Sequence, residues 1–170
     1  ARLRGVEVAG AQHVYNATQS SIRAYTLPPW ATDGGYKATV ARFDDLESLA
    51  KLDIETMEML AIRGGASKIK LIDPNPEING KTLDIVAFER GQTVPEAVRE
   101  LYRDRQGSVM NLELYDDNNT KFLSQEDWMM TCTDGRIPHP DQVSAHPRTY
   151  GSFTKKLREY VLEEKIISIF

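Results

Sequence analysis

The stretch Trp128–Gly151, WMMTCTDGRIPHPDQVSAHPRTYG, determines how the rest of the chain is interpreted. It begins with a short apolar run, residues 128–133, which ends at Asp134-Gly135. A loop rich in Pro and His follows, and Ser152 opens a segment with helical periodicity. This order predicts a strand, an acid at its C-terminal tip, a polar loop and a covering helix. In an α/β barrel the loops that follow the strands form the active face, so Asp134 is a candidate functional residue.

Size and composition indicate one ordinary globular domain. The chain has 170 residues, of which 41% are hydrophobic and 27% charged. A net charge of −4 argues against nucleic acid or an anionic membrane as the main partner. The single cysteine, Cys132, excludes an internal disulfide, and no apolar run approaches the roughly 20 residues that span a bilayer. Without a recognisable signal peptide, we expect a cytoplasmic protein.

Both ends of the sequence are typical of a segment cut from a longer protein, most simply at an artificial boundary. Ala1–Gly5 resembles the last turn of a helix that is capped by glycine. The other end, Lys165–Phe170, finishes on apolar residues without a polar tail.

Short apolar runs and helical patterns alternate along the chain, which favours parallel βα units. The expected strands cover residues 6–15, 68–72, 109–115 and 128–133, and a long loop covers 16–35. The expected helices cover residues 44–62 with Asp44 as the cap, 82–90, 93–107 with a capping box at Thr93, 121–127 and 152–164. About three strands have a barrel-like pattern, too few to close an eight-stranded barrel.

Asp134 is the first candidate for chemistry. An acid held directly after a buried strand can bind a metal, or can shuttle a proton from a metal-bound water. The same Asp-Gly pair is also a common turn. The pattern alone leaves both interpretations open.

His13 is the second candidate. It lies near the end of the first expected strand, on the face that also carries the small residues Ala9 and Ala11. A neutral imidazole there could bind zinc, and a structural core histidine fits the same pattern. Cys132 is expected to be a buried thiol, because no histidine close in sequence would activate it as a nucleophile.

The third candidate is Arg148 in the segment His146-Pro147-Arg148. A planar guanidinium pairs bidentately with a carboxylate, and Pro147 would restrict the backbone that directs it. An ordinary surface arginine after a loop proline fits equally well. His139 carries the same ambiguity and is expected in a mobile loop.

Several of these segments together resemble one family, the D-aminoacylase or N-acyl-D-amino-acid deacylase branch of the metal-dependent amidohydrolases. Thr133-Asp-Gly135 followed by His146-Pro-Arg-x-Tyr-Gly-Ser-Phe153 resembles the family signature (S/T)-D-G…H-P-R-x-x-G-T-F. Further matches lie at Gln12-His-Val-Tyr-Asn-Ala17, Leu27-Pro-Pro-Trp30, Gly34-Gly35, Asn79-Gly-Lys-Thr-Leu83, Ala87-Phe-Glu-Arg-Gly91 and Lys156-Leu-Arg-Glu-Tyr-Val161. The matches are collinear over nearly the whole chain.

The resemblance implies an α/β fold that is part of a (β/α)8 amidohydrolase barrel with one or two zinc ions. Residues 1–170 would form about strands six to eight, with an inserted segment at 66–76. The family hydrolyses the amide of N-acyl amino acids. Metal activates the water, the strand-eight acid transfers its proton to the leaving amine, and an arginine holds the substrate carboxylate.

Carried over by position, Asp134 would be the strand-eight acid, both catalytic and metal-binding, and His13 a strand-six metal ligand. Arg148 would be the carboxylate clamp, and His146 and Tyr150 of the same motif would lie on the substrate side. The strand motif has Ala11 and Val14 where the family has Asp and Pro. Some members have a substrate-facing tyrosine before the G-x-x-L segment, and its position falls near Asn75 in this sequence. This difference puts specificity for D-amino acids in doubt.

The family's other metal ligands would lie before Ala1, so the chain alone is expected to be inactive and to bind zinc poorly. Its open sheet edges could then support self-association. Two alternatives remain: a related enzyme that cleaves a cyclic amide or another C–N bond, and a non-catalytic barrel module.

Overall fold

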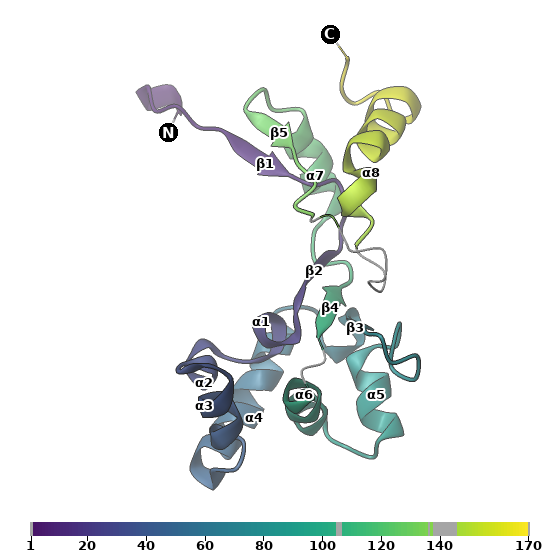
Figure 1. The fold of residues 1–170 in the computed structure, drawn as a ribbon. Coiled ribbons are helices and arrows are strands. Elements are labelled where there is room, and N and C mark those ends of the chain that lie inside the picture. Colours follow the sequence, from purple (N-terminus) through teal and green to yellow (C-terminus); the bar gives the residue numbers. More distant parts are fainter. Residues whose placement is uncertain (1, 105–106, 136, 138–145, 170) are drawn as a thin grey trace. The chain divides into compact units, whose positions relative to one another are not determined.

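The computed structural model describes residues 2–104, 107–135, 137 and 146–169. The chain divides into two compact units (Figure 1). Unit 1 combines residues 1–17 with residues 115–170, and unit 2 is the continuous segment 18–114. The first and last parts of the sequence therefore fold together, and a second unit is inserted between them.

Unit 1 is built on two parallel strands, β1 (Gly10–Gln12) and β5 (Met129–Thr131). Gly10 pairs with Met129, and a Cβ atom at Gly10 would lie only 3.0 Å from the Met129 side chain. Helix α7 (Asp117–Ser124) precedes β5, and the Gln12 side-chain amide donates to Thr120 O and Ser124 Oγ of this helix, both at 2.8 Å. The short helix η1 (Arg2–Arg4) lies at the start of unit 1.

The C-terminal part of unit 1 is helical. Helix α8 (Arg148–Lys155) continues directly into the π-helical segment η3 (Lys156–Glu163). Tyr160 of η3 is buried, whereas Phe153 and Leu157 are exposed, so the expected apolar face of this helix is only partly covered. The helix also begins at Arg148, four residues before the predicted start at Ser152.

Unit 2 contains a three-stranded sheet with the order β2-β4-β3, and both pairings are antiparallel. Its strands are β2 (Thr18–Ser21), β3 (Ile69–Ile72) and β4 (Ser108–Asn111). Its helices are α1 (Ile22–Thr26), α2 (Pro29–Thr32), α3 (Gly35–Arg42), α4 (Leu46–Ala61), η2 (Ala66–Lys68), α5 (Leu83–Glu89) and α6 (Val94–Arg103). The prediction of parallel pairing is confirmed for β1 and β5 and is wrong for this sheet.

The main hydrophobic core belongs to unit 2. Its buried side chains come from both ends of the segment, from Ile22 of α1 to Val109 of β4. Leu52 and Leu60 of α4 and Leu101 of α6 are completely buried in it. Because Thr18 pairs with Asn111, the chain enters and leaves unit 2 on adjacent strands. In unit 1 the two segments that flank unit 2 in sequence are joined by a hydrogen bond, in which Tyr115 N–H donates to Asn16 O at 2.9 Å.

Local signals explain the elements that were predicted correctly. Thr93 and Glu96 form the expected capping box of α6, with Pro95 in the first turn. Helix α4 is capped by Asp45, one residue after the expected Asp44, and Asp45 accepts from Ser48 N–H. The expected strand over 68–72 is β3, and residues 66–76, the predicted inserted segment, lie within unit 2.

Other boundaries were predicted incorrectly. The first strand covers Gly10–Gln12 instead of residues 6–15, and Val6 and Val8 before it are exposed. The segment 16–35 is not a loop, because it contains β2, α1 and α2, where Pro29 occupies the first turn of a helix. Helix α3 was not predicted. Among the described helices, none combines the length and apolar character needed to cross a membrane.

Candidate functional site

Asp134 follows strand β5 after a gap of two residues and has a left-handed backbone with φ 45°. Its side chain is 64% exposed. The next residue, Gly135, donates its N–H to Thr133 Oγ1. A Cβ atom at Gly135 would lie 2.7 Å from the Cα atom of Thr149, so only glycine lets the loop approach the start of α8 this closely. In the pair Asp134-Gly135, the glycine therefore allows the close approach to α8, and the aspartate presents an exposed carboxylate.

Arg148 is the first residue of α8 and is buried. Its Nη1 atom lies 2.9 Å from Asp134 Oδ2 and 3.3 Å from His13 Nε2. Its backbone carbonyl accepts from Ser152 Oγ one turn later, at 2.9 Å. The structure thus brings together three predicted site residues that are up to 135 positions apart in sequence.

The His146 imidazole is hydrogen-bonded to the backbone of Arg148. The backbone N–H of Arg148 donates to His146 Nδ1 at 3.0 Å, so Nδ1 carries no proton and Nε2–H donates to Ala17 O, also at 3.0 Å. The ring is only 2% exposed, and burial lowers its pKa to about 4. His146 is therefore neutral at pH 7 and links the start of α8 to the segment that follows β1.

His13 is buried beside Arg148, and its Nδ1 accepts the backbone N–H of Tyr15 at 3.3 Å. Burial lowers the pKa of the imidazole, the nearby Arg148 cation lowers it further, and Asp134 acts in the opposite direction. A neutral ring with an unprotonated Nδ1 carries its proton on Nε2. That proton would face the Arg148 guanidinium, which has donors only, so the 3.3 Å contact between Arg148 Nη1 and His13 Nε2 is a hydrogen bond only when the proton lies on Nδ1 instead. In either tautomer the Arg148 guanidinium contacts the Asp134 carboxylate, an arrangement suited to holding an anion.

Two tyrosines complete the surroundings of His13. The ring of Tyr115 lies edge-on at 5.7 Å between centroids, and Tyr15 lies at 6.4 Å from His13 and 5.3 Å from His146. The sequence shows Tyr15 only as a member of the motif at residues 12–17, and it gives no signal for Tyr115. No spacing pattern could connect Tyr115 with His13, because the whole of unit 2 separates them in sequence.

The other predicted residues lie differently. Tyr150 is 72% exposed on α8, and Cys132 is partly buried directly after β5. His139 lies outside the described residues. Within the described parts of the chain, no group of three or more His, Cys, Asp or Glu side chains is placed to hold a metal ion. The side chains present therefore do not by themselves fit a zinc centre, which needs three or four protein ligands.

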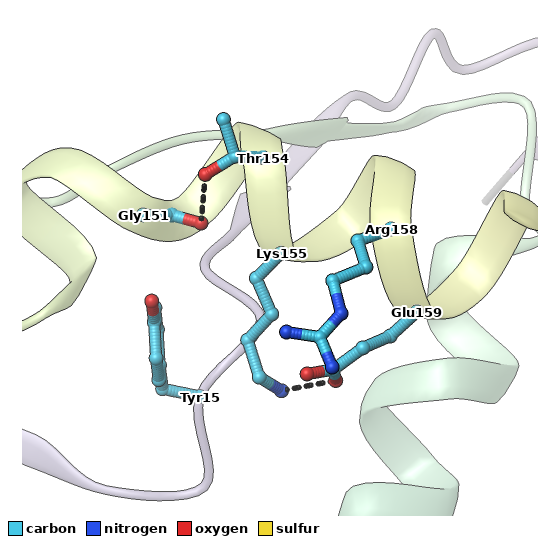
Figure 2. A pocket seen from close by; sticks show the side chains of 6 residues that line it. All are labelled: Tyr15, Gly151, Thr154, Lys155, Arg158 and Glu159. Atoms are coloured by element: carbon cyan, nitrogen blue, oxygen red, sulfur yellow. Dashed lines mark hydrogen bonds and ion pairs between the residues drawn. The ribbon is translucent and has the colours of Figure 1, made fainter. Parts of the chain in front are cut away.

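A cavity of about 490 Å³ lies near this site, between Tyr15 and the α8–η3 helix (Figure 2). Lys155 crosses it, donates to Val14 O at 2.9 Å and pairs with Glu159, also at 2.9 Å. A Cβ atom at Gly151 would lie 2.3 Å from the Tyr15 hydroxyl, so the glycine is needed for this packing. The paired Lys155 indicates that these residues fix the helix against residues 14–15 and so help to position Arg148.

Comparisons with known proteins were made for the whole chain. No family model matches it. A curated relative, N-acyl-D-glutamate deacylase of Alcaligenes xylosoxydans xylosoxydans, is 30% identical over 96 residues, which are 56% of this chain and 18% of the relative. These 170 residues therefore correspond to a small part of that enzyme.

Solved structures with the same fold come from the same group of enzymes. N-acyl-D-glutamate deacylase from Bordetella bronchiseptica, in complex with zinc and a phosphonate mimic of the tetrahedral intermediate, superposes with a TM-score of 0.62 at 22% identity. The match covers 99% of this chain and 27% of that one. A D-aminoacylase with a binuclear metal centre gives a TM-score of 0.60 at 18% identity, over 98% of this chain and 27% of that one. The α/β fold and the resemblance to the D-aminoacylase branch are thus confirmed.

Proposed function

We propose that the complete protein is a hydrolase that removes the acyl group from N-acyl amino acids, and that these 170 residues form one wall of its active site. The observation that carries the proposal is the cluster of Asp134, Arg148 and His13 after strands β1 and β5, in a chain with the fold of deacylases. An acid and a carboxylate-binding cation at one place suit a substrate that carries both an amide and a carboxylate. The assignment to about strands six to eight of a barrel is part of this proposal.

Arg148 is the proposed clamp for the substrate carboxylate. Its guanidinium is buried, so a carboxylate bound there is poorly screened by water and interacts more strongly than at the surface. The Asp134 carboxylate contacts Nη1 at 2.9 Å, which supports carboxylate binding at this guanidinium. The hydrogen bonds through His146 hold the start of α8 in place, and Tyr150 is proposed to contact substrate from its exposed position on the same helix.

Asp134 is the proposed general acid/base. Its exposed carboxylate can accept a proton from the attacking water and deliver it to the leaving amine nitrogen. When the substrate carboxylate occupies Arg148, the Asp134 carboxylate is released from this ion pair and can turn to the reacting amide.

A metal in the complete enzyme is proposed from its relatives, and His13 and Asp134 would contribute to its site only with ligands from outside these 170 residues. Bound there, the metal would activate water for attack on the amide. Metal binding through His13 Nε2 requires that nitrogen to lose its proton. Metal-free and metal-loaded protein would differ in the His13 tautomer, which nitrogen NMR shifts detect.

The substrate class follows from the same cluster. The relatives are named for N-acyl-D-glutamate and D-amino acids, so N-acyl-D-amino acids are the first substrates to test. A cyclic amide or a non-catalytic binding role remains the alternative. Neither requires a buried arginine beside the acid, which is why we favour a substrate with a free carboxylate.

Arg148→Ala in the complete protein tests the clamp. We expect kcat/KM for N-acetyl-D-amino acids to fall at least about 100-fold, the order expected when a buried charge-assisted pair is lost. For the matching α-carboxamides, which lack the carboxylate, the fall should be several-fold smaller. The matched control is Arg158→Ala, which removes an exposed arginine on η3 and should change neither value more than about twofold. Equal losses for acids and carboxamides would refute the clamp.

A further inference from the structure

Helix α4 of unit 2 has an exposed apolar stripe that the proposed deacylase site does not use. Leu46, Ile54 and Met57 are 82%, 63% and 47% exposed. With the exposed Ala50 and Ala61 they follow each other at intervals of four, four, three and four residues, which places all five on one side of the helix. A neighbouring side carries Leu52 and Leu60 into the core, so α4 has two apolar sides.

Charged residues follow one edge of this stripe. Glu47, Lys51 and Glu58 are exposed and lie on the same flank, since they are separated by four and seven residues. Lys51 lies 3.6 Å from Glu55 and over the Trp30 ring at 4.6 Å from its centroid. The flank thus carries one cation, Lys51, between two anions, Glu47 and Glu58.

We propose that the α4 stripe binds the α4 stripe of a second copy in antiparallel orientation. In an antiparallel pair centred on Ile54, Leu46 lies within one residue of the level of the partner copy's Ala61. Met57 lies within one residue of the level of the partner copy's Ala50, so large side chains of one stripe meet small side chains of the other. Lys51 then comes within one residue, about 1.5 Å along the axis, of the level of Glu58 in the other copy. The symmetry makes this ion pair twice.

The charges on this flank also determine the relative orientation of the two α4 helices. Antiparallel helices bring the same flank of each helix together, so the flank of Glu47, Lys51 and Glu58 faces its own copy. A parallel pair places this flank on opposite sides of the contact, so Lys51 of one copy does not meet Glu58 of the other. The surface is therefore complementary to itself in one orientation only.

The contact should be weak. Helix α4 has 16 residues, so one helix pair is about 24 Å long and smaller than a standard protein interface. We expect a dissociation constant on the order of 10–100 µM. This surface differs from the open edges of β1 and β5, which lie in unit 1.

The experiment is sedimentation velocity of the 170-residue chain from about 5 to 500 µM, in low salt. The wild type should pass from monomer to dimer over this range, and Ile54→Glu should weaken dimerisation at least tenfold. The matched control is Phe88→Glu, which changes an exposed apolar residue on α5 of the same unit and should leave the dimer unchanged. A chain that stays monomeric throughout would overturn the proposal and favour coverage of the stripe by another part of a longer chain. Equal weakening by both substitutions would also overturn it.

A charge exchange tests the orientation. Lys51→Glu or Glu58→Lys alone should weaken dimerisation several-fold, and both in one chain should restore it to within about threefold of wild type. The double variant rebuilds the pair between copies but not the Lys51–Glu55 pair within the helix, so restoration reports only the contact between molecules. Circular dichroism verifies that each variant is folded. Failure of the double variant to recover would contradict antiparallel pairing.

Discussion

His146 controls the position of the proposed clamp although it is not placed to do chemistry. Its two ring nitrogens join the first residue of α8 to Ala17, and both hydrogen bonds require the neutral ring with the proton on Nε2. Protonation would place an N–H against the N–H of Arg148. The burial that lowers its pKa therefore also fixes the geometry of its neighbour.

This predicts a stability that depends on pH. The pKa of His146 is about 4 in the folded chain, below the ordinary value of 6.5. The unfolded chain therefore binds more protons between these values, and the free energy of unfolding should fall as the pH decreases from 6.5 to 4. The slope attributable to His146 is at most about 1.4 kcal/mol per pH unit. Above pH 6.5 this contribution is constant.

Urea unfolding of the 170-residue chain at pH 7.0 and 4.5 measures the effect, with His146→Gln as the comparison. Glutamine can still donate to Ala17 O but does not titrate, so the variant should lose less stability between the two pH values than the wild type does. Equal losses in the two proteins would contradict the assignment of the shifted pKa to His146.

At the scale of residues, the sequence indicated Asp134, Arg148, His146 and His13 as candidates because each lies in a motif with limited chemical options, and their roles stay predictions. It could not find Tyr115, whose approach to His13 depends on how the chain returns from unit 2. It also could not show that Arg148 contacts Asp134, because that distance depends on the turn at Gly135.

At the scale of elements, helix α6 illustrates what local sequence determines. Thr93 Oγ1 accepts from Glu96 N–H while the Glu96 carboxylate accepts from Thr93 N–H at 2.6 Å. These bonds satisfy backbone donors that the first helical turn leaves without partners. The four residues involved are contiguous, so the helix start could be predicted without knowledge of the fold.

Thr93→Ala should therefore destabilise unit 2 by about 1 kcal/mol, the usual cost of losing an N-cap side chain. Thr93→Ser keeps the hydroxyl and should cost only a few tenths of that. Urea denaturation followed by circular dichroism compares the two. If serine and alanine destabilise the protein equally, the capping hydroxyl is not what stabilises the helix.

Elements without such local signals were missed. Strand β2 reads TQSS, which has no apolar alternation, and it forms because it pairs with β4, about 90 residues later. Helix α3 begins at Gly35, directly after a left-handed glycine, Gly34, and a Gly-Gly pair is typical of a turn and not of a helix start. Tertiary pairing and packing decide the structure of segments like these, because their local preferences are weak.

At the scale of the whole molecule, the alternation of strands and helices predicted the correct fold class but not the division into two units. The expected βα succession is interrupted by unit 2, which has its own antiparallel sheet and its own core. The two strands that carry the site, β1 and β5, are adjacent and parallel although unit 2 lies between them in sequence. A pairing over such a distance leaves no periodic signal in the chain.

The length of the chain relative to its matches is the reason why these residues are proposed as one wall of a site. The chain covers 27% of the length of the solved deacylases that it matches, and among its described residues no group of three or more His, Cys, Asp or Glu is placed to hold a metal ion. Activity is therefore a property to measure in the complete protein, where the acid, the clamp and the remaining ligands would act together.

The most direct measurement is the turnover number of Asp134→Asn in the complete protein with an N-acetyl-D-amino acid as substrate. Asparagine preserves the size of the side chain and an oxygen for Arg148 but cannot transfer a proton, so kcat should fall about 100- to 10,000-fold while the circular dichroism spectrum is unchanged. A kcat within a few-fold of wild type would contradict the role of Asp134 as the general acid/base and, with it, the proposed active site.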